Sequence, residues 1–91
     1  MMEKEDKKIN EEELLEHGMF YLINEKYDKA IEEFDRVIKI NPGNAEAYYN
    51  IGLAFESKNM PEKAKEMYKK ALEKNPKHKL SREHLEKLIG I

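Results

Sequence analysis

Apolar residues recur along this chain at the three- or four-residue spacing of amphipathic helices. One stretch places Ala30, Phe34 and Val37 on a single stripe, and a later stretch repeats the arrangement from Ala64 to Leu72. Proline and asparagine interrupt the pattern between stretches. The pattern predicts an all-α chain of five helices over residues 11–24, 28–40, 45–58, 61–74 and 79–89, with the first turn at residues 25–28.

Capping residues stand where these helices are expected to begin and end. Asn10 can cap the first helix, and Glu13 three residues later completes a capping box. Asn44 can cap the third helix, Pro61 fits the first turn of the fourth, and Gly90 suits a C-terminal cap. Local sequence and apolar pattern therefore agree on the helix boundaries.

The chain also repeats itself at an interval of 34 residues. Gly18 returns as Gly52, Ala30 as Ala64, Phe34 as Tyr68, and the pair Asn41-Pro42 as Asn75-Pro76. A period of this length is typical of solenoids, in which pairs of helices bury their apolar faces by stacking. The repeat divides the chain into a charged mobile leader (1–10), two helix pairs (11–44 and 45–78) and a last helix (79–91).

The repeat pattern resembles the tetratricopeptide repeat family. The resemblance covers residues 11–78, and the residues that carry it are Leu14, Gly18, Tyr21, Ala30, Phe34, Pro42, Tyr48, Ile51, Gly52, Phe55, Ala64, Tyr68 and Pro76. It implies an α-solenoid of two repeats with right-handed superhelical stacking, closed by a capping helix with Leu85 and Leu88 on its apolar side. It also implies that the protein binds other proteins.

His17 departs from the family pattern, because leucine is usual at its position and the second repeat has Ile51 there. We expect it to be a half-buried neutral histidine. The number of repeats is a second departure, since independent stability is associated with at least three. The fifth helix is expected to compensate by covering the second repeat.

Composition narrows the functional classes. The chain has 91 residues, no cysteine, 17 basic and 19 acidic residues, and a formal net charge of −2. This balance gives no support for broad binding to nucleic acid or membrane, and the charged N-terminal residues lack the apolar stretch of a signal peptide. We therefore expect a cytoplasmic protein. Arginine occurs only twice, a bias toward lysine and glutamate that resembles thermophile proteins but also fits any exposed helical protein.

Catalytic and metal-binding motifs are missing from the sequence. It has no glycine-rich phosphate loop, and Ser57 and Ser81 have no context of a catalytic triad. His78 and His84 are six residues apart, which is not a one-turn ligand spacing. We expect no enzyme activity, no cofactor, no metal and no small-molecule substrate.

Lysines gather between Lys63 and Lys79, with glutamates interleaved among them. A solvated convex face is the favoured interpretation. Weak binding to RNA or to acidic partners is the other, and it would show a steep dependence on salt.

In the resembling family, the first helix of each pair lines a concave surface. The resemblance implies that a partner contacts Leu15, Met19, Leu22, Ile23, Tyr49, Asn50 and Leu53. Members of the family that bind chaperone tails use basic residues and asparagines to clamp a terminal carboxylate, and of the matching positions here only Asn50 conforms. The predicted groove is instead apolar at its centre.

The first helix is apolar around nearly its whole circumference, which is unusual at the end of a stack. One interpretation packs Leu14, Phe20 and Tyr21 within the first pair and leaves the rest exposed. Otherwise the surface binds a peptide or an amphipathic helix of another protein, or it is buried against a second copy in a homodimer or helix-exchanged oligomer. The sequence leaves adaptor and self-association both open, and favours the adaptor.

Overall fold

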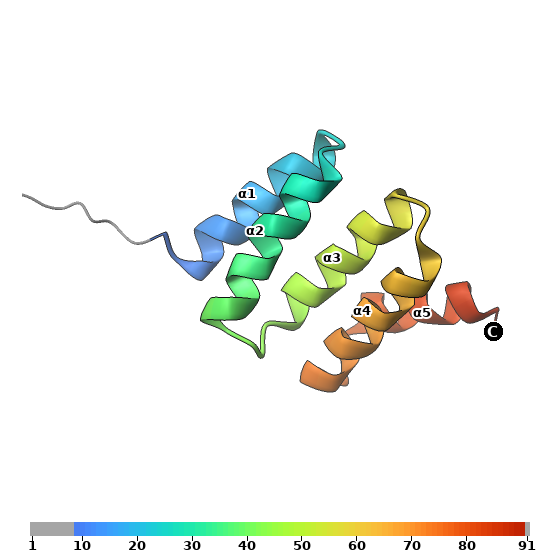
Figure 1. The fold of residues 1–91 in the computed structure, drawn as a ribbon. Coiled ribbons are helices and arrows are strands. Elements are labelled where there is room, and N and C mark those ends of the chain that lie inside the picture. Colours follow the sequence, from blue (N-terminus) through green and yellow to red (C-terminus); the bar gives the residue numbers. More distant parts are fainter. Residues whose placement is uncertain (1–8, 91) are drawn as a thin grey trace, which may run out of the picture.

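The computed structural model describes residues 9–90, and within this range the chain forms five α-helices and no strand. Helices α1 (Glu11–Ile23) and α2 (Tyr27–Ile40) form one antiparallel pair, and α3 (Ala45–Ser57) and α4 (Pro61–Lys74) form the next (Figure 1). Helix α5 (Lys79–Ile89) packs against α4. The all-α stack of two helix pairs and a last helix confirms the predicted fold class.

The first ten residues are described only in part. The predicted mobile leader, residues 1–10, lies outside the described residues except for Ile9 and Asn10, which are both exposed.

The caps predicted from sequence are present. The Asn10 side chain accepts a hydrogen bond from the Glu13 N–H, and the Glu13 carboxylate accepts one from the Asn10 N–H. Asn44 accepts from the Ala47 N–H at 3.0 Å, and Gly90 ends α5 in the left-handed region at φ 82°. These bonds pair backbone groups that the helix ends would otherwise leave without partners.

Three predicted boundaries shift by one residue each, and the simplest case is α3, which ends at Ser57 rather than Lys58. Helix α1 ends at Ile23 rather than Asn24, and α2 begins at Tyr27, so the turn is shorter than expected. Glu25 makes this possible by adopting φ 62°, a left-handed conformation that turns the chain within three residues.

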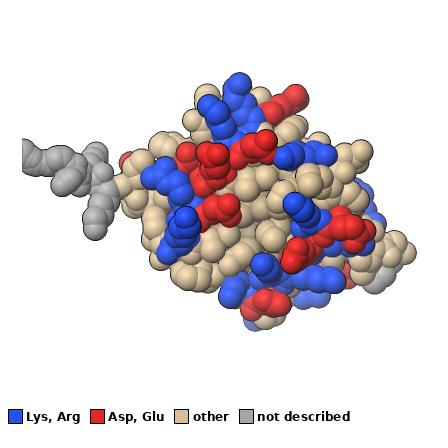
Figure 2. Space-filling view, in the orientation of Figure 1, with Lys and Arg blue, Asp and Glu red and all other residues tan. Residues whose placement is uncertain are grey.

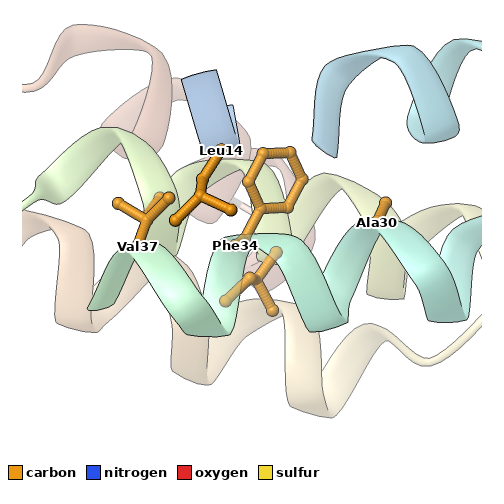
Figure 3. Packing of buried hydrophobic residues seen from close by; sticks show 6 residues of the cluster. Leu14, Ala30, Phe34 and Val37 are labelled. Atoms are coloured by element: carbon orange, nitrogen blue, oxygen red, sulfur yellow. The ribbon is translucent and has the colours of Figure 1, made fainter. Parts of the chain in front are cut away.

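Buried residues form two core clusters, one for each helix pair. The first joins both helices of its pair to α3, and it consists of Leu14, Ala30, Phe34, Val37, Ala47 and Ile51. Figure 3 shows Leu14 of α1 directed toward Phe34, which lies between Ala30 and Val37 on α2. The second cluster consists of Ala45, Tyr49, Ala64, Tyr68 and Ala71. Each pair is thus closed by an aromatic ring from its second helix.

Glycines at the repeated positions let these rings approach the facing helix. A Cβ atom built on Gly52 would lie 2.5 Å from Tyr68 Cε1 and 2.8 Å from Tyr68 Cδ1. A Cβ on Gly18 would overlap the Phe34 ring in the same way. Because both rings are fully buried, neither can move aside without disturbing the core.

Polar contacts add a second connection between the pairs. The Glu11 carboxylate at the start of α1 accepts hydrogen bonds from the side-chain amides of Asn41, at 2.8 Å, and Asn44, at 2.5 Å. Both asparagines belong to the turn between α2 and α3. One carboxylate thereby ties the first helix to the start of the second repeat.

Helix α5 covers the second cluster. Leu85 and Leu88 pack against that cluster, while Glu83, Glu86 and Lys87 are exposed, as expected for a capping helix. Glu86 occupies the repeat position of Gly18 and Gly52. No aromatic ring of a further helix could approach α5 there in the way that Tyr68 approaches Gly52.

Ala replacement of Gly52 is expected to destabilise the protein by about 1–3 kcal/mol, because the added methyl group overpacks the core against Tyr68. The higher helix propensity of alanine, about 1 kcal/mol, works in the opposite direction. Gly43→Ala is the matched control, since a Cβ there meets only Asn41 Oδ1 at 3.4 Å. Urea unfolding measures both, and a Gly52→Ala variant as stable as wild type would contradict the close approach.

Ser81→Ala is expected to raise the free energy of unfolding by about 0.5–1 kcal/mol. Ser81 is fully buried, its hydroxyl has no hydrogen-bond partner within residues 9–90, and its repeat position in α3 is already alanine, Ala47. Thermal unfolding measures the effect, with exposed Ser57→Ala as control. A loss of stability in Ser81→Ala would mean that the hydroxyl has a partner after all.

Candidate functional site

A groove with a volume of about 570 Å³ runs along α1 and reaches α3. Its apolar lining consists of Leu15, Met19, Phe20 and Ile23, and its polar lining of Glu12, Glu16, Glu46 and Asn50. Helical spacing explains the grouping, because residues four apart stand on the same face. Leu15, Met19 and Ile23 form one such row on α1, and Glu46 and Asn50 form another on α3.

The groove brings together four of the seven residues predicted from sequence, namely Leu15, Met19, Ile23 and Asn50. The other three lie elsewhere. Leu22 packs against the first core cluster. Tyr49 is only 7 % exposed and belongs to the second cluster.

Leu53 lines a separate hollow of about 270 Å³ together with Glu56, Ser57 and His84. This hollow lies where α3 meets α5, which contributes His84, and not where α3 meets α1.

Glu16 and Phe20 line the groove although neither was predicted to lie on the concave surface. One of the two interpretations packed Phe20 within the first pair, but its side chain is 62 % exposed, and its ring meets that of Tyr21 edge to face at a centroid distance of 5.8 Å. For Phe20 that interpretation is wrong. Spacing alone could have identified both residues, since Glu12, Glu16 and Phe20 form a continuous row next to Leu15 and Met19.

The outer face of α1 differs from the corresponding face of α3. In α3, Ala47, Ile51 and Ala54 are buried, and α2 packs against this helix. The residues 34 positions earlier are Glu13, His17 and Phe20. Among the described residues, no helix precedes α1 to cover them.

His17 is consequently exposed. The expectation of a half-buried histidine is wrong, because its repeat partner Ile51 is buried only by virtue of the preceding helix pair. The polar side chains at these positions leave Phe20 as the apolar exception on this face.

A polar network connects α5 to the second pair. The Tyr68 hydroxyl donates to Glu56 Oε1 at 2.5 Å, and His84 Nδ1 lies 3.1 Å from the same oxygen. Burial raises the pKa of Glu56, but the hydrogen bonds from Tyr68 and His84 outweigh it and hold the pKa below its ordinary value. Burial and the Glu56 carboxylate both raise the pKa of Tyr68, which therefore remains a proton donor.

A second histidine of α5 lies against the same region. His78 Nδ1 accepts from the Ser81 N–H at 3.3 Å, and His78 Nε2 lies 3.3 Å from Glu46 Oε1. Accepting at Nδ1 assigns the ring proton of the neutral form to Nε2, which can then donate to Glu46. The rings of His78 and His84 pack on Tyr49 at centroid distances of 5.2 and 5.6 Å. These contacts hold α5 against the second helix pair. The polar side chains that form them already have partners within the fold.

The described part of the chain gives little support for a metal site, a membrane-spanning helix or a broad surface patch of one charge. Among residues 9–90, no group of three or more histidine, aspartate or glutamate side chains could hold a metal ion. None of the helices described is both long and apolar enough to cross a membrane. On the face seen in Figure 2, basic and acidic residues alternate instead of forming one patch of a single sign.

Two family models match the sequence. A model described as TPR repeat matches residues 18–59, and one described as tetratricopeptide repeat matches residues 45–78. The two matches overlap and together span both helix pairs from Gly18 onward.

Two of the similar proteins are described as tetratricopeptide repeat proteins. The tetratricopeptide repeat domain-containing protein PYG7, chloroplastic, of Arabidopsis thaliana is 32 % identical over 65 residues, which are 71 % of this chain and 22 % of that protein. The crystal structure of YrrB, described as a TPR protein with an unusual peptide-binding site, superposes with a TM-score of 0.79 at 34 % identity over 80 % of this chain. That of MamA gives a TM-score of 0.82 at 25 % identity over 87 %. This chain spans about a fifth of PYG7, 38 % of YrrB and 46 % of MamA.

Stability should decline in acid partly through Glu56. A carboxyl whose pKa is lowered by folding contributes stability above its unfolded pKa of about 4.3, and this contribution is lost as the pH falls through the lower folded value. Urea unfolding between pH 7 and pH 3 should therefore show a shallower decline for Glu56→Gln than for wild type. Glu66→Gln, which replaces an exposed glutamate of α4, is the control and should follow wild type. Equal slopes for Glu56→Gln and wild type would contradict the assignment.

Proposed function

This chain belongs to the tetratricopeptide repeat family, and from that premise we propose that it is a non-catalytic module that binds a peptide segment of another protein in the groove of α1 and α3. Repeats of this family serve in general as protein-interaction modules. The activities and partners of the longer proteins that resemble it do not extend to this chain by similarity alone.

The observation that carries the proposal is the combination of exposed apolar side chains with a buried amide in one groove. Ile23 is 75 % exposed, Phe20 62 % and Met19 37 %, so an occupant would remove a substantial apolar surface from water. Asn50, at the same groove, is 2 % exposed. Concave apolar sites with a few oriented polar groups are typical of ligand-binding sites.

The similarity to YrrB supports a peptide as the occupant. Its structure is described as having a peptide-binding site, and 80 % of this chain superposes on it. Because this chain spans 38 % of YrrB, the comparison supports the class of ligand and leaves its sequence to be found by experiment.

Self-association is the second candidate, and the exposure of Phe20 and Ile23 favours it, since a second copy could cover both. The neighbouring residues weigh against it. A further helix stacked on α1 in the manner of α2 on α3 would bury Glu13 and His17 where α3 presents Ala47 and Ile51. Burying a carboxylate that has no opposite charge beside it costs several kcal/mol, so repeat-like stacking of two copies is disfavoured.

The double variant Met19→Glu with Ile23→Glu is expected to weaken peptide binding at least tenfold, because it places two charges in the apolar lining of the groove. Ile40→Glu is the matched control, since Ile40 is 54 % exposed on α2 and does not line the groove. Peptides selected from a random displayed library on wild-type protein are measured by isothermal titration calorimetry, with circular dichroism verifying helicity.

Sedimentation equilibrium over a hundredfold concentration range distinguishes the two candidates. A monomer that selects peptides supports the proposal. If wild type is a stable dimer and the double variant is a monomer, the groove serves self-association and the proposal is overturned. Peptides that bind the double variant as tightly as wild type would also overturn it.

A further inference from the structure

The two helices that line the groove carry charge of one sign. Helices α1 and α3 together contain six glutamates and no lysine or arginine. Helices α2 and α4 contain eight lysines and arginines mixed with seven aspartates and glutamates. The net charge of the chain is small, but the charges are unevenly distributed. The second helix of each pair carries both signs, whereas the first carries glutamates and no lysine or arginine.

Three of these glutamates line the groove. Glu12 and Glu16 stand one turn apart on α1, Glu46 stands on α3, and all three are exposed. Within residues 9–90, neither Glu12 nor Glu16 forms an ion pair, and no basic residue lines the groove. Three carboxylates beside an apolar surface attract cations and repel anions.

The negative character continues along α3. The pKa of Tyr49 is raised, first by burial and then by the charges of Glu46, Glu56 and Glu83. Lys87 of α5 supplies the nearest opposing charge on that side, where it helps to lower the pKa of Glu56. The purely acidic part of the surface is thus the part formed by α1 and α3.

Asn50 adds a neutral polar group to the groove. Its side-chain amide forms no hydrogen bond with any other residue in the range 9–90, although the residue is 2 % exposed. Its polar atoms are not cut off from solvent, since among the described residues only the Ser81 hydroxyl is both buried and without a partner. The amide is therefore open to the groove, where an occupant with free backbone N–H and C=O groups can hydrogen-bond to it. An extended peptide presents such groups, whereas a helix keeps them paired internally.

On the premise of the proposed function, we infer that the groove selects an extended segment in which lysine or arginine alternates with apolar residues. The apolar side chains cover Leu15 and Met19, the backbone reaches Asn50, and the basic side chains approach Glu12, Glu16 and Glu46. The distance along α1 from Glu12 to Ile23 is about 16 Å at 1.5 Å per residue. About five extended residues span it.

The first experiment compares three fluorescent, end-blocked hexapeptides by anisotropy at low ionic strength. Leucine alternates with lysine in the first, with glutamine in the second and with glutamate in the third. Alternation makes the first peptide amphipathic only when it is extended, because side chains of an extended chain alternate between faces. The lysine peptide is expected to bind at least tenfold more tightly than the glutamine peptide, and the glutamate peptide more weakly than both.

The second experiment changes the protein. Glu12→Lys with Glu16→Lys is expected to lower the affinity for the lysine peptide about tenfold and to reduce its dependence on salt. The control is Glu32→Lys with Glu66→Lys, which changes the net charge equally at exposed positions of α2 and α4. This control should bind within about twofold of wild type, because neither residue lines the groove.

A third measurement tests the extended conformation. Replacing one leucine of the lysine peptide by proline prevents a helix but permits an extended chain. A loss of binding no greater than that caused by alanine at the same position is expected. A far greater loss with proline than with alanine would indicate a helical occupant and overturn the inferred conformation.

The outcomes separate this inference from the proposed function. Equal affinity for the three peptides, or equal weakening by both pairs of charge reversals, would overturn the basic selectivity while leaving a peptide-binding groove intact. Binding of none of them, together with no selection from a random library, would overturn both.

Discussion

The contact between a helical glycine and a buried aromatic ring is the constraint on which the rest of this structure depends. Gly52 faces Tyr68, and Gly18 faces Phe34, at distances that leave no room for a Cβ atom. Each contact sets how closely the two helices of a pair approach. Because both pairs use the same contact at the same interval, they have matching surfaces and can stack.

The stack leaves its first helix covered on one side only. The face of α1 directed toward α2 is buried through Leu14 and Gly18, and the opposite face carries Glu13, His17 and Phe20 in place of the buried residues of α3. The groove lies between these two faces. The exposure of Phe20 follows from the lack of a preceding helix among residues 9–90, since its repeat partner Ala54 in α3 is fully buried.

The other end of the molecule uses its polar residues for packing. His78 and His84 of α5 lie on Tyr49 and contact Glu46 and Glu56, which gives the short last helix polar as well as apolar contacts with the second pair. Asn50 of the same helix α3 remains without such a contact among the described residues and lines the groove. Two neighbouring parts of α3 thus differ in whether their polar groups are already satisfied.

The sequence by itself determined the five helices, their caps and the stacking of two pairs under a last helix. These features depend on local propensity and on steric contacts that recur at a fixed interval, so each has a signal in the order of residues. The family resemblance of the sequence also placed Leu15, Met19, Ile23 and Asn50 on one concave surface, and the structure brings these four together in the groove. Only the tertiary structure decided that Tyr49 and Leu53 lie elsewhere and that Phe20 and His17 are exposed. Those outcomes depend on which helices cover a residue, and the cover comes from segments far along the chain whose approach no local pattern records.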